Sequence, residues 1–335
     1  MVEFLMASAD TIFHTIIQPA SGCPAFMSQP ELNHVLCHFP LGPRRMAYWQ
    51  WGDPRSEHLV LCVHGLTRQG RDFDVLAQAL LAKAQSQGRS IRVVCPDVAG
   101  RGHSDRLSDA SFYQPLTYVA DMQALMAQLH SQAPVQHFDW VGTSMGGVIG
   151  MLSAVQGQGW PVPVRRLVLN DIGPALSWAG LEHIRGYVGT VGPFASLAQG
   201  LAQLRERMAT FGAHTDEAWA ALNLPMFRPA PGQPDLQSGP VVLHYDPAIA
   251  EPFKTLTPES NAQGAEFMRA VYEQIKCQTL LLRGAQSALL SPEAALEMTQ
   301  RGPQPQLLEF AGVGHAPTLV APDQHQPVCD FLLAA

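Results

Sequence analysis

The chain has 335 residues, 47% of them hydrophobic and 15% charged, and its formal net charge is −7. This composition is typical of a folded globular protein and argues against extensive disorder, and the length allows a single α/β unit with an insertion. Because the chain contains only three lysines and no basic stripe, we expect no nucleic-acid partner.

Residues 1–40 show no clear hydrophobic period and are predicted to form an N-terminal extension. No Lys or Arg precedes Arg44, whereas a secretory signal starts with a basic region. No apolar run approaches the roughly 20 residues that span a bilayer. We therefore expect a cytoplasmic protein with no membrane partner.

Within this extension, His34, Cys37 and His38 have the spacing of metal ligands on a helix. Zinc sites usually have four ligands and no fourth is evident, so surface histidines are the favoured interpretation. The six cysteines are scattered without a paired spacing. We therefore predict neither a metal site nor a disulfide framework.

From Arg44 onward, strand-like runs alternate with helical patterns, which predicts an α/β fold with a mostly parallel sheet and helices on both faces. The run at 44–52 is predicted as an edge strand and the run at 58–64 as a buried central one. The remaining predicted strands are at 91–95, 137–142, 165–170, 277–282 and 306–310, and the predicted helices at 72–85, 118–130, from 145 onward, 291–300 and 323–333.

Residues 174–262 interrupt this alternation after the sixth strand and are predicted to be a helical cap, or lid, over a pocket. The segment holds helical stretches as well as the Pro- and Gly-rich "RPAPGQPDLQSGP". A flexible linker is the alternative, but Trp178 and Trp219 favour packing. The core would then comprise residues 41–173 and 263–335.

The stretch "FDWVGTSMGG" carries the clearest chemical signal, because a hydrophobic strand runs into Gly142, Ser144 and Gly146 and a helix follows. This is the context of the G-x-S-x-G nucleophile elbow, in which glycines permit a tight turn that exposes the serine hydroxyl. A plain Gly-Ser turn is the alternative. We predict Ser144 as a nucleophile.

A serine nucleophile needs a base and donors for the developing oxyanion. His315 follows the last predicted strand in a glycine-bracketed loop and stands after the serine, in the order usual for this motif. The backbone amides of Met145 and Leu66 are the predicted oxyanion donors. His64, beside Leu66, is predicted to be structural.

Together, these features resemble the α/β-hydrolase fold superfamily, and within it the capped bacterial serine hydrolases and esterases. The resemblance implies an enzyme that needs no metal or organic cofactor and acts on a small-molecule acyl ester. It maps the nucleophile to Ser144, the base to His315 and the oxyanion amides to Leu66 and Met145. It rests on "HGLTRQGRDFD", "CPDVAGRGHSD", "WVGTSMGG", "LVLNDIGP", "LLLRGAQS" and "GVGHAP", which span about residues 60 to 320.

The chain departs from this family at the acid that orients the histidine. The family loop after the seventh strand typically reads RG-x-x-S-D-L-L, and the position of its Asp is Ala288 here. Either the protein is impaired, or Asp171 serves instead, as in some haloalkane dehalogenases that carry the acid after the preceding strand. Asp171 could equally pin the loop into the cap. Glu293 is a weaker candidate, because the helix dipole already favours an acidic residue in the first turn of a helix.

Four residues are expected to bind substrate: Arg68, Arg71, Phe73 and Trp178. The two arginines could hold a substrate carboxylate, although ion-paired or solvated arginines are the favoured alternative. Asp97 is expected to hold its own turn, with Arg101 as its partner.

The sequence thus predicts a serine-dependent carboxylic ester hydrolase. Two alternatives remain open at this point. One is hydrolysis of a carbon–carbon bond in a diketone-like acid, which would use the same side chains. The other is a non-catalytic binding protein, suggested by Ala288.

Overall fold

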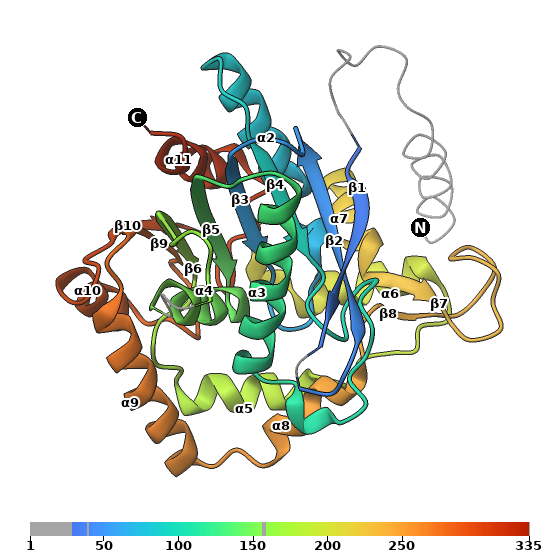
Figure 1. Ribbon diagram of the computed structural model, residues 1–335. Coiled ribbons are helices and arrows are strands. Elements are labelled where there is room, and N and C mark those ends of the chain that lie inside the picture. The colour runs from blue at the N-terminus through green and yellow to red at the C-terminus, as the bar shows by residue number, and fades with distance from the viewer. Residues whose placement is uncertain (1–28, 39, 156–158, 335) are drawn as a thin grey trace.

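An eight-stranded sheet forms the centre of the computed structural model, which describes residues 29–38, 40–155 and 159–334 (Figure 1). The strand order is β1-β2-β4-β3-β5-β6-β9-β10; β1 and β2 are antiparallel to their neighbours, and the other pairs are parallel. The strands are β1 (Glu31–Cys37), β2 (Arg44–Gly52), β3 (His58–Val63), β4 (Arg92–Pro96), β5 (His137–Thr143), β6 (Arg166–Asn170), β9 (Gln278–Gly284) and β10 (Gln306–Phe310).

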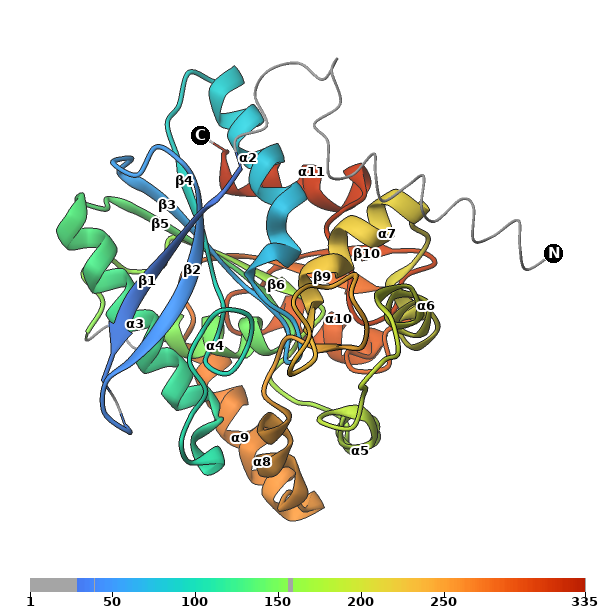
Figure 2. The same cartoon turned by 90° about the vertical axis from the view of Figure 1, so that its right-hand side faces the viewer.

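Helices cover both faces of the sheet, as Figure 2 shows. On one face, α2 (Asp74–Ser86) and α11 (Pro322–Leu332) contact each other over a core cluster that includes Leu76 and Val328. The other face carries α3 (Pro115–Gln132), α4 (Met145–Val155), α9 (Pro258–Gln274) and α10 (Pro292–Gln300). The central strands β3 and β6 are buried along their whole length and mostly apolar, as is typical of strands covered on both faces.

The expected edge strand at 44–52 is not at the edge, because β1 pairs with it along its outer side. The predicted extension, residues 1–40, therefore overlaps the sheet by one strand. The spacing of His34 and Cys37 is also not helical: both lie on β1, where residues three apart point to opposite faces. His34 is exposed and Cys37 is buried accordingly.

The whole of the predicted cap, residues 174–262 and called the cap segment below, lies between β6 and β9, and its predicted end falls within α9. It contains α5 (Trp178–Tyr187), α6 (Leu197–Arg207), α7 (Asp216–Asn223), the hairpin β7 (Phe227–Pro229) and β8 (Val241–Leu243), and α8 (Glu251–Lys254) before α9. Several of these helices begin at residues whose hydroxyls accept a backbone amide, namely Ser177, Ser196, Thr215 and Thr257. Figure 1 shows α5 and α8 along the bottom and α6 with the β7–β8 hairpin at the right, whereas α7 is drawn higher.

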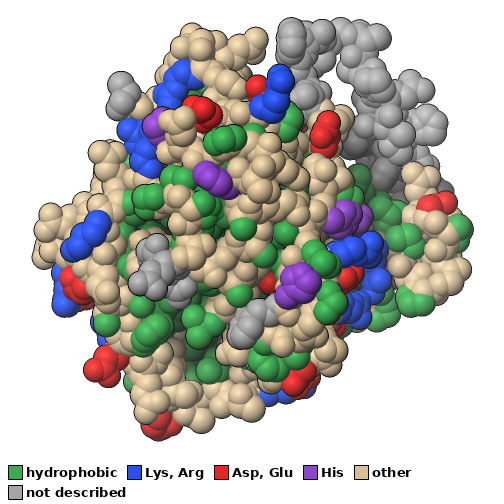
Figure 3. Space-filling view, in the orientation of Figure 1, with side chains coloured by type: hydrophobic (Ala, Val, Ile, Leu, Met, Phe, Trp, Pro, Cys, Tyr) green, Lys and Arg blue, Asp and Glu red, His purple; other side chains and the backbone are tan. Residues whose placement is uncertain are grey.

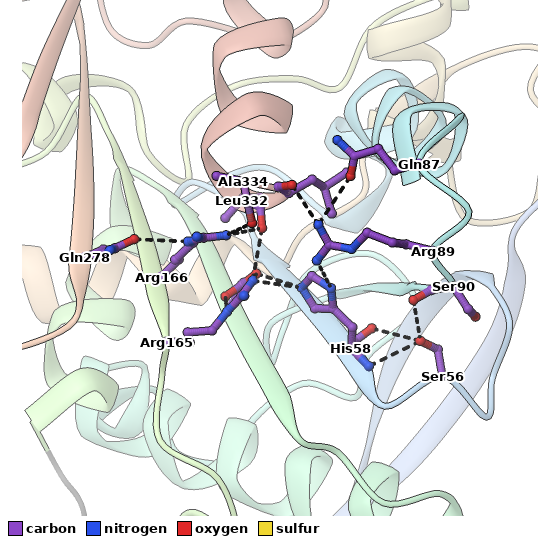
Figure 4. Close-up of polar contacts among 12 residues, drawn as sticks. Ser56, His58, Gln87, Arg89, Ser90, Arg165, Arg166, Gln278, Leu332 and Ala334 are labelled. Atoms are coloured by element: carbon purple, nitrogen blue, oxygen red, sulfur yellow. Dashed lines mark hydrogen bonds and ion pairs between the residues drawn. The ribbon is translucent and has the colours of Figure 1, made fainter. Parts of the chain in front are cut away.

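The amino ends of the strands meet the C-terminal end of α11 (Figure 4). Arg165 and Arg166 donate to the carbonyl of Leu332, at 3.0 and 2.9 Å. The buried Asp139 carboxylate accepts from Arg165 at 2.5 Å and lies 2.7 Å from Nε2 of His58. Cations at a helix C-terminus compensate its exposed carbonyl dipoles, so this cluster anchors α11 to the sheet.

His and Arg side chains gather at the right of the space-filling view in Figure 3. The rings of His103 and His244 lie 4.9 Å apart. Burial is the main cause that lowers the pKa of His244 to about 4, and the charges of Arg228 and Arg106 add to it.

Among the described residues, no helix combines the length and the apolar character that crossing a membrane requires.

Candidate active site

Ser144 lies in the turn between β5 and α4, with a backbone φ of 52°. This left-handed conformation is rare for a residue with a side chain and is held here by tight packing. A Cβ at Gly142 would come within 2.3 Å of the Gly146 carbonyl oxygen, and one at Gly146 within 1.9 Å of the Val63 oxygen. Only glycine fits at either position, which explains the pattern around the serine.

His315 lies in the loop after β10, and its imidazole reaches the serine. Its Nε2 is 2.9 Å from the Oγ of Ser144, a distance at which the hydroxyl can donate its proton. The Asn170 side chain connects the two loops, because its Nδ2 donates to Thr143 Oγ1 at 3.0 Å and to the Pro317 carbonyl at 2.8 Å.

Asp171 follows β6 directly and is fully buried, with a φ of 57°. Its Oδ2 lies 2.7 Å from Nδ1 of His315. The same carboxylate accepts the Gly284 amide on Oδ1 at 2.9 Å and the Ser287 hydroxyl on Oδ2 at 2.6 Å. A buried carboxylate must have such partners, and these two hold it towards the imidazole.

Ala288 is exposed, and neither it nor any other residue of 285–290 carries a carboxyl group. Its neighbour Ser287 corresponds to the Ser of the family pattern, and its hydroxyl donates to Asp171. Glu293 lies exposed in the first turn of α10, where its own backbone amide and the Ser291 hydroxyl lower its pKa. Of the candidate acids, Asp171 is the one at hydrogen-bond distance from His315.

The loop after β3 lies against the nucleophile, since a Cβ at Gly65 would be 3.8 Å from that of Ser144. Leu66 follows Gly65, and Met145 begins α4, where the helix provides no carbonyl for its amide. Both predicted oxyanion donors therefore belong to segments beside Ser144.

His64 is fully buried under this loop. Its Nδ1 is 2.7 Å from the Gly65 carbonyl oxygen, and its Nε2 accepts the Val98 amide at 2.9 Å. Burial lowers its pKa to about 3, so the ring is neutral near pH 7. The expectation that His64 is structural agrees with these contacts.

The two arginines proposed to bind substrate are already engaged. Arg68 donates to both oxygens of Asp72 at 2.7 Å and to Asn223 Oδ1 of α7 at 2.8 Å. Arg71 donates to Asp74 at 2.5 to 2.9 Å. These are the ion-paired arginines that the sequence left as an alternative, and Arg68 in addition joins the loop after β3 to the cap segment.

The other two residues predicted to bind substrate lie in different places. Phe73 is buried in the core cluster beneath α2, on the face of the sheet opposite α4, so it is not available to a ligand. Trp178 begins α5 and is partly buried, with the Arg185 guanidinium 5.3 Å from its ring centroid.

Asp97 holds its own turn, as predicted, by accepting the amides of Gly70 at 2.8 Å and His103 at 2.9 Å. Burial raises its pKa to about 6. Its expected partnership with Arg101 is wrong, because the Arg101 guanidinium points to the carbonyls of Leu66 and Ala99 instead.

The cap segment touches the histidine loop through residues that sequence reasoning missed. The Gly314 amide donates to the Thr210 carbonyl at 2.6 Å, and His214 Nε2 lies 2.9 Å from Thr318 Oγ1. No local pattern marks Thr210 or His214, since their partners are distant in the sequence.

The part of the chain that the structure describes contains no group of three or more His, Cys, Asp or Glu side chains that could hold a metal ion.

Comparison with known proteins gives a consistent family. The model of the alpha/beta hydrolase family matches residues 60–330. A 3-hydroxybutyrate-oligomer hydrolase from Cupriavidus necator is 46% identical over 298 residues, covering 89% of this chain and 96% of that protein. A 2-hydroxymuconate semialdehyde hydrolase from Pseudomonas putida is 27% identical over 67% of this chain and 70% of its own length.

Among solved structures, an alpha/beta hydrolase from Novosphingobium aromaticivorans is similar with a TM-score of 0.73 and 31% identity. The similarity covers 92% of this chain and 99% of that one.

Proposed function

The chain belongs to the alpha/beta hydrolase family, and we propose that it hydrolyses carboxylic esters with Ser144 as nucleophile, His315 as base and Asp171 as acid. The observation that carries the proposal is a chain of two hydrogen bonds. It runs 2.9 Å from Ser144 Oγ to His315 Nε2 and 2.7 Å from His315 Nδ1 to Asp171 Oδ2. A serine hydroxyl needs such a base to react near neutral pH.

In this mechanism, Ser144 Oγ bonds to the acyl carbon while its proton passes to Nε2 of His315. The imidazolium keeps its Nδ1–H on Asp171, whose carboxylate balances the new charge. The amides of Leu66 and Met145 bind the negative oxygen of the tetrahedral intermediate. His315 then gives its proton to the leaving alcohol, and a water molecule deprotonated by the same imidazole releases the acyl group.

For the substrate, we assign short oligomeric esters of 3-hydroxybutyrate, because the relative with 46% identity over 89% of the chain is a 3-hydroxybutyrate-oligomer hydrolase. We assign residues 174–262 the role of a cap that shapes the pocket. The contacts of Thr210 with Gly314 and of Asn223 with Arg68 support this role, since they join the segment to both loops beside Ser144.

The two alternative functions have less support. Hydrolysis of a carbon–carbon bond in a diketone-like acid would need Arg68 or Arg71 to hold a substrate carboxylate. Arg68 is already paired with Asp72, and Arg71 with Asp74. The binding-protein alternative was linked to Ala288, and the buried Asp171 offers His315 a carboxylate from another strand.

Ser144→Ala tests the proposal. The wild-type protein should be labelled covalently by a fluorophosphonate probe and should hydrolyse both a p-nitrophenyl acyl ester and a 3-hydroxybutyrate oligomer. Ser144→Ala should lose the label and both activities. The matched control is Ser153→Ala in the same helix, because the Ser153 hydroxyl is buried without a hydrogen-bond partner. Labelling that persists in Ser144→Ala would contradict the nucleophile, and hydrolysis of the simple ester without the oligomer would contradict the substrate.

A further inference from the structure

Arg101 is a fully buried arginine without a carboxylate partner. In the described part of the chain, no Asp or Glu oxygen lies within 4.0 Å of its guanidinium, although eleven pairs of an arginine with a carboxylate occur elsewhere in that part. A guanidinium remains charged at any ordinary pH, so its positive charge is balanced here by dipoles alone. Burying an unpaired charge is costly, which raises the question of what this side chain does.

The guanidinium contacts neutral groups only. Its Nε donates to the Leu66 carbonyl at 2.8 Å, and its Nη1 donates to the Ala99 carbonyl at 2.6 Å and to the Tyr118 hydroxyl at 2.9 Å. Its central carbon lies 5.6 and 5.2 Å from the ring centroids of Tyr113 and Tyr118. Aromatic faces attract cations, so the two rings hold the charge in place without neutralising it.

Arg101 contacts both residues that are assigned as oxyanion donors, Leu66 and Met145. Besides the Leu66 carbonyl, Arg101 reaches Met145, whose Sδ lies 3.6 Å from Nη2. One guanidinium thus touches both segments whose amides would bind the oxyanion. Its charge also acts on His64, beside Leu66: burial is the main cause of the lowered pKa of that ring, and Arg101 contributes to it.

The backbone of Arg101 is fixed as well. Arg101 forms an isolated antiparallel bridge with Tyr245 of the cap segment, and its amide donates to the Val98 carbonyl at 2.9 Å. The neighbouring Gly102 amide donates to the His244 carbonyl at 2.8 Å. The side chain therefore has little freedom to leave the loop after β3.

We propose that Arg101 is a positioning residue for the oxyanion site: it fixes Leu66 through its carbonyl and places a buried positive charge behind the two amide donors. This inference rests on the proposed function. A preorganised positive charge is worth most where water is excluded and negative charge develops in the transition state. The ester carbonyl oxygen carries no such charge before the reaction, so the effect should appear in kcat and not in KM.

The test compares Arg101→Met and Arg101→Lys with a matched control, Arg92→Met. Arg92 is also fully buried and donates to two backbone carbonyls, those of Pro54 at 2.7 Å and Ala133 at 2.8 Å. It begins β4, whereas Arg101 follows the other end of the same strand. Both Met variants remove a buried arginine, and circular dichroism melts give the folded fraction by which each rate is corrected.

For Arg101→Met we expect kcat on a p-nitrophenyl acyl ester to fall by about 10- to 100-fold, less than the loss of a direct oxyanion donor. KM should stay within about twofold, and the affinity for an aryl trifluoromethyl ketone, whose serine adduct carries an oxyanion, should fall in parallel with kcat. Arg101→Lys should recover part of both, because it restores the charge. Arg92→Met should alter neither quantity per folded molecule.

The inference is overturned if folded Arg101→Met binds the ketone as tightly as the wild type, or if Arg92→Met loses kcat equally. Should Arg101→Met fail to fold, Arg101→Lys decides, because loss of the Nε donor to Leu66 must still weaken ketone binding. Failure of the proposed function is distinct, since the wild type itself would then neither hydrolyse the ester nor react with the ketone.

Discussion

Oδ2 of Asp171 and Nδ1 of His315 are 2.7 Å apart, although 144 positions separate the two residues in the chain. Asp171 follows β6 and His315 follows β10, and β9 lies between these two strands in the sheet. The contact therefore crosses the end of β9, whose last residue, Gly284, donates its amide to the same carboxylate. In the proposed mechanism, the loop after β9 therefore needs no acid of its own.

Asp171→Asn should reduce ester turnover by up to about 10⁴-fold, as the loss of a triad carboxylate does in serine proteases. The amide can still occupy the site, but it cannot balance an imidazolium and favours the wrong tautomer of His315. Turnover of a p-nitrophenyl ester, measured against Glu293→Gln as the control carboxylate, checks this. A residual rate within about twofold of wild type would remove Asp171 from the mechanism.

Ala288→Asp should change turnover by no more than about twofold, because Nδ1 of His315 already lies against Asp171. Position 288 is exposed, so the new carboxylate would remain solvated. The same substitution in the Asp171→Asn background measures whether position 288 can supply the acid at all. A large gain from Ala288→Asp alone would mean that Asp171 does not serve His315.

Ser287→Ala should lower kcat by about tenfold while KM stays nearly constant. The variant removes the 2.6 Å hydrogen bond that holds Oδ2 of Asp171, and a hydrogen bond to a charged group is worth about 1.5–3 kcal/mol. Ser291→Ala is the control, since its hydroxyl caps α10 and interacts with Glu293 instead of Asp171. Steady-state kinetics of both variants check the prediction, and equal effects on kcat would contradict it.

Asn223→Ala should loosen the cap segment where it meets the loop after β3. Its buried amide accepts from Arg68 at 2.8 Å and donates to the Trp219 carbonyl at 2.9 Å. Leaving these groups unpaired costs about 1–3 kcal/mol. We expect KM for a 3-hydroxybutyrate oligomer to rise more than KM for p-nitrophenyl acetate, which needs less of the pocket. The control is Asn261→Ala, whose amide bonds the Leu176 carbonyl at 3.2 Å.

Acid should destabilise the protein in part through His244. Its pKa is about 4 in the folded chain, mainly through burial and with contributions from His103, Arg228 and Arg106, against 6.5 for the free side chain. A depressed pKa means that the contribution to stability is present above pH 6.5 and is lost as the pH falls towards 4.

His244→Gln should therefore lose less stability over this interval, by up to about 1.4 kcal/mol per pH unit, because it cannot take up the proton. Urea unfolding at several pH values measures the slope. Identical slopes for the variant and the wild type would show that His244 does not titrate in this way.

Local sequence determined much of this protein. The glycines around Ser144 fix the turn because a Cβ at Gly142 or Gly146 would overlap backbone atoms a few residues or one strand away. The continuous apolar run of β3 predicted a buried central strand. The helical periods likewise predicted most helices, because this signal acts over one or two turns of chain.

Only the tertiary structure decided how distant side chains pair. From the sequence, Asp171 is only one of several candidate acids for His315. The predictions that Arg101 pairs with Asp97 and that Phe73 binds substrate are wrong, and β1 at the edge of the sheet is not predicted. Each of these depends on contacts between segments far apart in the chain. A residue type states what a side chain can bind, but its actual partner is set by strand order and by the close packing of the interior, which no local pattern contains.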